Sequence, residues 1–170
     1  MFSDTVIFQT KRLRCRLWVR EDLEVIYSVY SDKQGARWVG DGQPISREDA
    51  IRWLDVTFKN YSGRGYGMST VIEKATGTIV GFCGLVHPNG QQHAEIKYSF
   101  KKTHWGLGYA SEIVPGMISY GNTVHGLGKI IATVADENIA SQRVLQKSHM
   151  SLSDEYEENG QKILVYEWDA

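Results

Sequence analysis

The sequence predicts a mixed α+β fold in which strands and helices follow the order β-α-α-β-β-β-α-β-α-β-β. Two features carry this prediction. A strand, a helix and a second strand succeed one another across residues 93–135, which implies a right-handed crossover and a parallel pair of strands. Asn159-Gly160, between two strand-like segments near the end of the chain, is a strong hairpin signal. We therefore expect about seven strands and about four helices.

The hydrophobic pattern locates each element. Leu13, Cys15 and Leu17 alternate with arginines, which is typical of a strand with one polar face. Ser46, followed by acidic residues, predicts the N-cap of a helix. Residues 129–135 are apolar enough for a strand buried on both faces. The predicted strands are 12–18, 66–73, 78–87, 93–100, 129–135, 152–156 and 163–168. The predicted helices are 21–30, 46–60, 108–120 and 138–147, with loops over 32–44 and 101–107 and turns at 62–65 and 88–90.

Length and composition limit the possible classes of protein. The 170 residues fit one domain over 1–170, and neither a linker nor a repeat divides them. Hydrophobic residues make up 42% and charged residues 23%, with a net charge of −1, so disorder and binding to nucleic acid by bulk positive charge are not expected.

Cysteine content and hydropathy indicate the compartment. Cys15 and Cys83 are too few for a disulfide framework or a four-ligand zinc site. The histidines show no metal-ligand spacing, so no metal is expected. No apolar run reaches the ~18–20 residues of a membrane span, and the start of the chain is unlike a signal peptide. We therefore expect a cytoplasmic protein with reduced thiols.

The most informative segment is Trp105-Gly-Leu-Gly-Tyr-Ala-Ser-Glu112, which follows a predicted strand and opens a predicted helix. Two glycines let the main chain approach a ligand closely, and the free N–H groups of the helix start favour an anion such as a diphosphate. The spacing matches neither the P-loop nor G-x-G-x-x-G, because no Lys-Ser/Thr follows and Ser111 takes the place of the third glycine. On the motif alone, a plain tight turn is an equally good interpretation.

The chain resembles the GNAT superfamily of N-acetyltransferases, and within it the branch of RimJ/RimL-like ribosomal-protein N-terminal acetyltransferases. Short matching pieces occur in the family order over nearly the whole chain. These pieces are Thr10-Lys-Arg-Leu13, Glu21-Asp-Leu23, Ala94-Glu-Ile-Lys-Tyr98, Trp105-Gly-Leu-Gly-Tyr-Ala110, Asn138-Ile-Ala-Ser141, Arg143-Val-Leu145 and Lys147. The resemblance implies a mostly antiparallel sheet whose parallel central pair of strands is splayed around acetyl-CoA.

The resemblance also implies how acetyl-CoA, the expected cosubstrate, is bound. The loop from Trp105 to Ala110 would wrap the diphosphate with main-chain N–H groups, and Tyr98 would line the pantetheine arm. Asn138 would contact the pantetheine end, and Ser141 would sit near the sulfur as a proton donor. The implied cofactor-binding residues are Tyr98, Trp105, Gly106, Leu107, Gly108, Tyr109, Ala110, Asn138 and Ser141. The alternatives are a simple N-cap for Asn138, a first-turn polar residue for Ser141 and packing for Trp105.

The sequence departs from the family pattern at three places, and the first and third of these concern the geometry of the site. Lys97 stands where the family has a glycine, and Lys147-Ser-His-Met150 replaces the usual Lys-Leu-Gly-Phe. Pro115 lies about two turns into the predicted cofactor helix, where proline costs ~3 kcal/mol and kinks a helix.

Acetyl transfer to an amine requires a neutral amine, a polarised thioester carbonyl and a proton for the departing thiolate. Glu95 is the candidate base, because a carboxylate in a central strand needs a reason if both sheet faces are covered. The alternative is a Glu95–Lys97 pair on one face at a solvated edge. Ser141 is the second candidate catalytic residue.

Arg37, Trp38 and Tyr66 are the candidate acceptor-binding residues, since the first two helices and their loop flank the acceptor pocket in this fold. Tyr66 and the weaker candidate His87 are more often packed or surface residues. Three functions stay open: an N-acetyltransferase acting on a primary amine of a peptide N-terminus or a small molecule, a non-catalytic acetyl-CoA-binding module, and a plain nucleotide-binding domain. We expect a monomer or a homodimer, with neither nucleic acid nor membrane as a partner.

Overall fold

The computed structural model describes residues 4–170, so the expectation of no signal peptide rests in part on residues outside the described range. One sheet of eight strands has the order β1-β2-β3-β4-β5-β6-β8-β7. All neighbours are antiparallel except β5 and β6, which are parallel as predicted. The strands are β1 (Val6–Gln9), β2 (Leu13–Leu17), β3 (Met68–Glu73), β4 (Ile79–Val86), β5 (Ala94–Phe100), β6 (Lys129–Ala135), β7 (Ser151–Glu158) and β8 (Gln161–Asp169).

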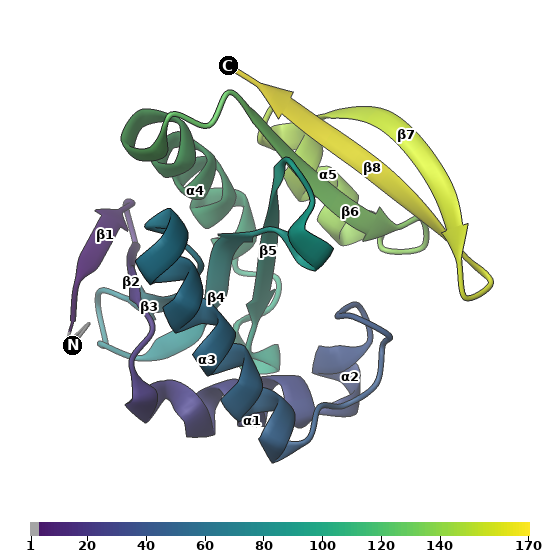
Figure 1. The fold of residues 1–170 in the computed structure, drawn as a ribbon. Helices are drawn as coiled ribbons and strands as arrows, with labels where there is room; N and C mark the ends of the chain where they lie inside the picture. Colours follow the sequence, from purple (N-terminus) through teal and green to yellow (C-terminus); the bar gives the residue numbers. More distant parts are fainter. Residues whose placement is uncertain (1–3) are drawn as a thin grey trace.

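Helices pack on both faces of the sheet (Figure 1). The α-helices are α1 (Leu23–Ser31), α2 (Lys33–Ala36), α3 (Arg47–Arg64), α4 (Tyr109–His125) and α5 (Ile139–Lys147). Helices α4 and α5 pack on one face in a cluster that includes Ile113, Met117 and Leu145. Helices α1 and α3 pack on the opposite face, where Ile26 and Leu54 share a second cluster with Phe82 of β4.

Local signals account for several element boundaries. The Ser46 hydroxyl accepts a hydrogen bond from the Asp49 amide at 3.1 Å, and the Asp49 carboxylate accepts one from the Ser46 amide at 3.0 Å. This reciprocal cap confirms the predicted start of α3. Asn159 and Gly160 have φ of 51° and 75°, which confirms the tight turn between β7 and β8.

Several predicted boundaries were wrong. The four-residue β1 is an eighth strand that the periodicity did not reveal. The stretch 62–64 belongs to α3, which ends at left-handed Gly65, rather than to a turn. The predicted loop 32–44 contains the short helix α2, whose Gly35 amide donates to the Asp32 side chain at 2.8 Å. The cofactor helix continues to His125 and passes through an exposed Pro115.

The prediction that 129–135 is buried on both faces was also wrong. Ile130, Ala132 and Val134 are buried beneath α4 and α5, whereas Ile131 and Thr133 are only partly buried. The face of β6 that carries Ile131 and Thr133 contributes nothing to the cluster under α1 and α3. We call this the open face of the sheet; it also carries Glu95 and Lys97 of the neighbouring strand β5.

Candidate functional site

Strands β5 and β6 pair only where they begin. Each has seven residues, but the register joins only Ala94 with Ile130 and Glu95 with Ile131. On its other side, β6 pairs with β8 at seven positions. Beyond Glu95 and Ile131 the two backbones run apart, as Figure 1 shows, and we call this point the strand fork. The fork leaves facing main-chain groups that β5 and β6 do not pair with each other, so a ligand can lie along them.

Glu95 is buried at the fork and points to the open face. Its side chain is only 4% exposed, yet it is surrounded by polar partners. The Thr133 hydroxyl donates to Oε1 at 2.5 Å, and the Lys97 ammonium lies 2.6 Å from the same oxygen. The Gln91 amide adds a long contact to Oε2 at 3.4 Å. The predicted pair with Lys97 therefore exists, but the position of Glu95 is inside the sheet and not at a solvated edge.

Tyr98 and Ser141 meet on the opposite face from Glu95. Successive side chains of a strand alternate between faces, so Tyr98 points toward α4 and α5. Its hydroxyl forms a short hydrogen bond with the Ser141 hydroxyl. Burial raises the pKa of Tyr98 more than the hydrogen bond with Ser141 lowers it, and the resulting pKa is about 12. Both hydroxyls therefore carry protons at neutral pH, and they bridge β5 and the first turn of α5.

Asn138 caps α5, as one of the two interpretations expected. Its Oδ1 accepts a hydrogen bond from the Ser141 amide at 3.2 Å. The cap fixes the first turn of α5 and, with it, the Ser141 side chain.

The glycine loop leads from the end of β5 to the start of α4. Gly106 and Gly108 have φ of 75° and 79°, a left-handed backbone conformation that residues with a side chain rarely adopt. Gly108 is the N-cap residue of α4, and no side chain caps this helix. Among residues 4–170, no acceptor is found for the main-chain N–H groups of Gly106, Leu107 and Gly108. The loop therefore offers free N–H donors at the positive end of a 17-residue helix, which favours an anion.

Trp105 anchors this loop to the strand before it. Its indole N–H donates to the Phe100 carbonyl at 2.7 Å, while the residue stays 49% exposed. This contact agrees with the structural alternative for Trp105. Leu107 is similarly exposed, at 48%, beside it.

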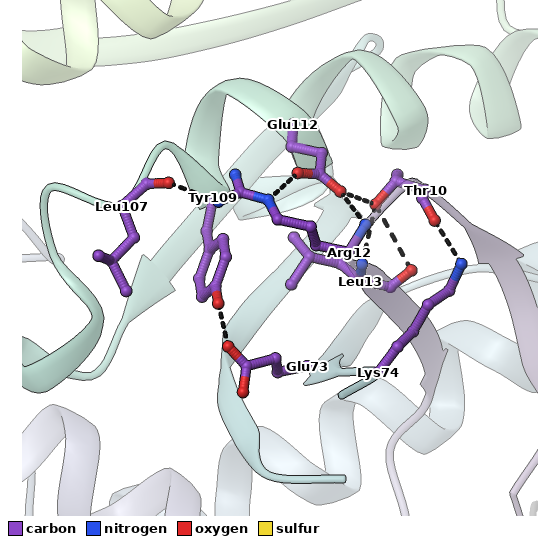
Figure 2. A network of polar contacts seen from close by, with 8 residues as sticks. All are labelled: Thr10, Arg12, Leu13, Glu73, Lys74, Leu107, Tyr109 and Glu112. Carbon is purple, nitrogen blue, oxygen red and sulfur yellow. Dashed lines mark hydrogen bonds and ion pairs between the residues drawn. The ribbon is translucent and has the colours of Figure 1, made fainter. Parts of the chain in front are cut away.

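Arg12 clamps the loop from the other side (Figure 2). Its Nε donates to Glu112 at 2.7 Å and its Nη1 donates to the Leu107 carbonyl at 2.9 Å. The guanidinium lies 4.6 Å from the centre of the Tyr109 ring, and the Tyr109 hydroxyl donates to Glu73. Glu112 also accepts from the Arg12 amide at 2.6 Å and the Thr10 hydroxyl at 2.5 Å. The segment between β1 and β2 thus holds both ends of the turn that opens α4.

Arg37 and Trp38 lie together near the segment that follows β6. The Arg37 guanidinium is 4.3 Å from the centre of the Trp38 ring, and its Nη2 is 3.8 Å from Glu137. Trp38 is 38% exposed. These contacts bring the segment after α2 to the β6–α5 connection, next to Asn138.

Tyr66 does not join Arg37 and Trp38. It is buried, and its hydroxyl is 2.8 Å from Nε2 of His87. Its ring packs against His125. Burial in the cluster beneath α4 fits the packed alternative for Tyr66, and its role in binding an acceptor stays a prediction.

Sequence reasoning missed three polar contributors. Arg12 is inside a quoted motif but had no assigned role, and Glu112 lies 100 residues away from it. Thr133 reaches Glu95 from another strand, 38 residues along the chain. The only available signal was their residue type, because strand order decides these contacts.

Other possible sites in the described part of the chain are less informative. A search of residues 4–170 finds no group of three or more His, Cys, Asp or Glu that could hold a metal ion. Over the same residues, no helix has both the length and the apolar character needed to cross a membrane. A cavity of about 260 Å³ lies between α1, α2 and residues 100–103, and one of about 280 Å³ lies between β1 and α4. Neither is lined by a predicted site residue.

The forked parallel pair beside a glycine loop at a helix start is the arrangement that the resemblance to the GNAT superfamily implied. Comparison with known proteins identifies the same family. Residues 12–151 match the family model described as acetyltransferase (GNAT) domain. The chain is 35% identical over 144 residues to the uncharacterized N-acetyltransferase YoaA of Bacillus subtilis (strain 168). The aligned region covers 83% of this chain and 80% of YoaA. The chain belongs to the GNAT family of acetyltransferases.

Solved structures share the fold. RimL, a ribosomal α-N-protein acetyltransferase solved with coenzyme A, superimposes with a TM-score of 0.81 at 16% identity, covering 96% of this chain and 97% of RimL. Spermidine N-acetyltransferase from Vibrio cholerae, solved with CoA and spermine, gives a TM-score of 0.78 at 18% identity, covering 93% of this chain and 95% of that chain. At these identities the likeness concerns the fold, which confirms the predicted α+β architecture.

Proposed function

We propose that this protein transfers an acetyl group from acetyl-CoA to a primary amine by direct attack in a ternary complex. The observation that carries the proposal is the strand fork with a buried carboxylate on one face and a pair of hydroxyls on the other. A thioester in the fork would have Glu95 on the side of the incoming amine and Tyr98–Ser141 on the side of the leaving sulfur.

The glycine loop fits the diphosphate of acetyl-CoA. The free N–H groups of residues 106–108 and the uncapped start of α4 supply donors without a competing side chain. Arg12 holds this loop in place through Leu107 and Glu112. Acetyl-CoA supplies a thioester carbonyl that is activated toward amines.

The residues at the fork divide the remaining chemistry between them. An α-amine has a reference pKa of ~7.7–8.0 and a lysine amine ~10.4, so the second depends more on a base. Glu95 accepts the proton of the incoming ammonium, directly or through a water. A main-chain N–H of β5 beyond the fork can donate to the thioester oxygen. The Ser141 or Tyr98 hydroxyl donates a proton to the departing thiolate.

The acceptor is proposed as a primary amine, on either a peptide N-terminus or a small molecule. RimL and spermidine N-acetyltransferase, which share the fold, are named for acceptors of these two kinds. Arg37, Trp38 and the open face beside Glu95 are the surfaces that an acceptor would meet. Binding of acetyl-CoA alone, without catalysis, is the alternative function.

An acceptor screen tests the proposal. The full chain is incubated with acetyl-CoA and a panel of N-terminal peptides, polyamines, aminoglycosides and amino acids, and CoA release and product mass are followed. Glu95→Gln is expected to lower kcat by about 10²-fold or more, as for a lost general base. Glu157→Gln is the control for loss of one carboxylate, because Glu157 is exposed on the edge strand β7. CoA binding by calorimetry with no turnover of any acceptor would favour the binding module instead.

A further inference from the structure

Lys97 is the side chain that the proposed chemistry leaves unexplained. It stands two residues after Glu95 on β5, on the same face of the sheet. Its Nζ is 2.6 Å from Glu95 Oε1, and its side chain is 44% exposed. The resemblance to the family places a glycine here, so an amine beside the candidate base is a property of this chain.

The fork gives this amine its significance. Glu95 and Ile131 are the last paired residues of β5 and β6, so Lys97 is the first open-face residue of β5 after the strands part. If the thioester lies in the fork, the Lys97 amine is already beside both the thioester and the candidate base.

Lys129 provides an internal comparison. It lies on the open face of β6 and is also held by carboxylates, Glu167 at 2.8 Å and Asp169 at 3.2 Å. It precedes the paired residues Ile130 and Ile131, so it lies at the closed end of the β5–β6 pair. Both lysines are partly exposed and ion-paired, but only Lys97 follows the opening.

We propose that Lys97 is itself an acetyl acceptor, so that the chain acetylates its own Lys97 Nζ from acetyl-CoA. This inference rests on the proposed function. The Lys97 ammonium gives one proton to Glu95 across their existing contact, and the free amine attacks the thioester carbonyl carbon. The C–N bond forms as the C–S bond breaks, the nitrogen loses its second proton to solvent water, and the sulfur takes a proton from the Ser141 or Tyr98 hydroxyl. The proton on Glu95 replaces the lost hydroxyl proton by exchange with solvent.

Acetylation of Lys97 removes one positive charge from the strand fork. Acetyl-lysine is neutral, so the ion pair with Glu95 is lost and the carboxylate becomes available to the ammonium of an external acceptor. Acetylation of Lys97 would therefore remove an internal competitor for Glu95 and lower the KM for a cationic acceptor.

Acetylation of the folded, full-length chain, followed by mass spectrometry of its peptides, tests this inference. Purified protein is incubated with acetyl-CoA alone, and the rates of acetylation of Lys97 and Lys129 are compared by peptide mapping. Lys97 is expected to react at least about tenfold faster than Lys129, at a rate independent of protein concentration. Glu95→Gln is expected to slow the acetylation of Lys97 by about 10²-fold and to leave the rate of acetylation of Lys129 unchanged. Heat-unfolded chain, which lacks the fork, gives the rate of uncatalysed acetylation.

The outcomes separate this inference from the proposed function. Equal rates at Lys97 and Lys129, or no reaction at Lys97 while the same preparation acetylates an external amine or binds CoA, would overturn the self-acetylation alone. A preparation that neither binds CoA nor acetylates any amine would overturn the proposed function and this inference together. As a second measurement, Lys97→Gln, which mimics the neutral product, is expected to lower the KM for a cationic acceptor relative to Lys97→Arg.

Discussion

Arg12 binds Glu112 across 100 residues of sequence, with Nε 2.7 Å from Oε2 and the main-chain amide 2.6 Å from Oε1. The same guanidinium donates to the Leu107 carbonyl at 2.9 Å. The contacts therefore join the turn before β2 to both the glycine loop and the first turn of α4. A loop held in its binding conformation before the ligand arrives loses less conformational entropy on binding.

Removal of the Arg12 side chain should weaken binding of coenzyme A without unfolding the protein. We expect Arg12→Ala to raise the Kd for CoA by about tenfold, equivalent to ~1.4 kcal/mol, because the loop must then be ordered by the ligand. Arg12→Lys should recover little, since one ammonium cannot reproduce the planar set of donors. Isothermal calorimetry measures the change, and Arg14→Ala, at an exposed position of β2 two residues further along the chain, is the control. Equal affinities for Arg12→Ala and Arg14→Ala would show that the clamp does not position the loop.

Glu112 should make stability depend on acid pH. Burial raises the pKa of its carboxyl, but hydrogen bonds from Thr10 and Arg12 outweigh burial and leave the pKa below its ordinary value. A carboxyl with a lowered folded pKa stabilises the fold above its unfolded pKa of ~4.3, and this stabilisation is lost as pH falls through the folded pKa.

Unfolding of Glu112→Gln measures this contribution. The wild-type chain should be more stable than Glu112→Gln at pH 7, and the difference in the free energy of unfolding should shrink as the pH falls below ~4.3. Glu157→Gln, on the exposed strand β7, serves as the control for loss of one surface carboxylate. A difference that stays constant from neutral to acid pH would contradict the linkage.

Gly106 should matter for the ligand more than for the fold. Its φ of 75° strains any residue with a side chain, by about 1–2 kcal/mol. Gly77 has a φ of 71°, and for both glycines no atom lies within 4 Å of an added Cβ. Gly106→Ala and Gly77→Ala should therefore lose similar stability in urea, but only Gly106→Ala should weaken CoA binding, because its side chain faces the space where N–H donors must approach an anion. Similar CoA affinities for the two variants would place the diphosphate elsewhere.

Periodicity and turn chemistry were enough for most of the fold. The Ser46 cap, the Asn159-Gly160 hairpin and the parallel pair around α4 depend on short-range patterns, and the structure confirms them. Strand β1 was missed because its four residues are too few to show a period. The second face of β6 was predicted as buried because sequence does not reveal how far α1 and α3 extend over the sheet.

The candidate site was predictable in residue type but not in contacts. The glycine loop follows from local spacing, whereas the bonds of Glu95 to Thr133 and of Arg12 to Glu112 depend on which strands and helices are neighbours. Glu95 and Lys97 illustrate the limit. Their spacing predicted a pair, but burial of Glu95 follows from the central place of β5 in an eight-stranded sheet. The catalytic and binding roles of these residues stay predictions. The same holds for the organisation of the chain as a single domain.

Tyr98 and Ser141 should act as one unit in protonating the sulfur. Their hydroxyls are hydrogen-bonded to each other, and burial raises the pKa of Tyr98 to about 12, so both remain protonated through the working range of pH. Tyr98→Phe and Ser141→Ala should each lower kcat by about 10²-fold with little change in the Kd for CoA. The double variant should be scarcely slower than either single variant, because groups that act together are not additive. Steady-state kinetics with calorimetry as the binding control measures this, and two independent, multiplying effects would mean that only one of the hydroxyls donates the proton while the other supports the fold.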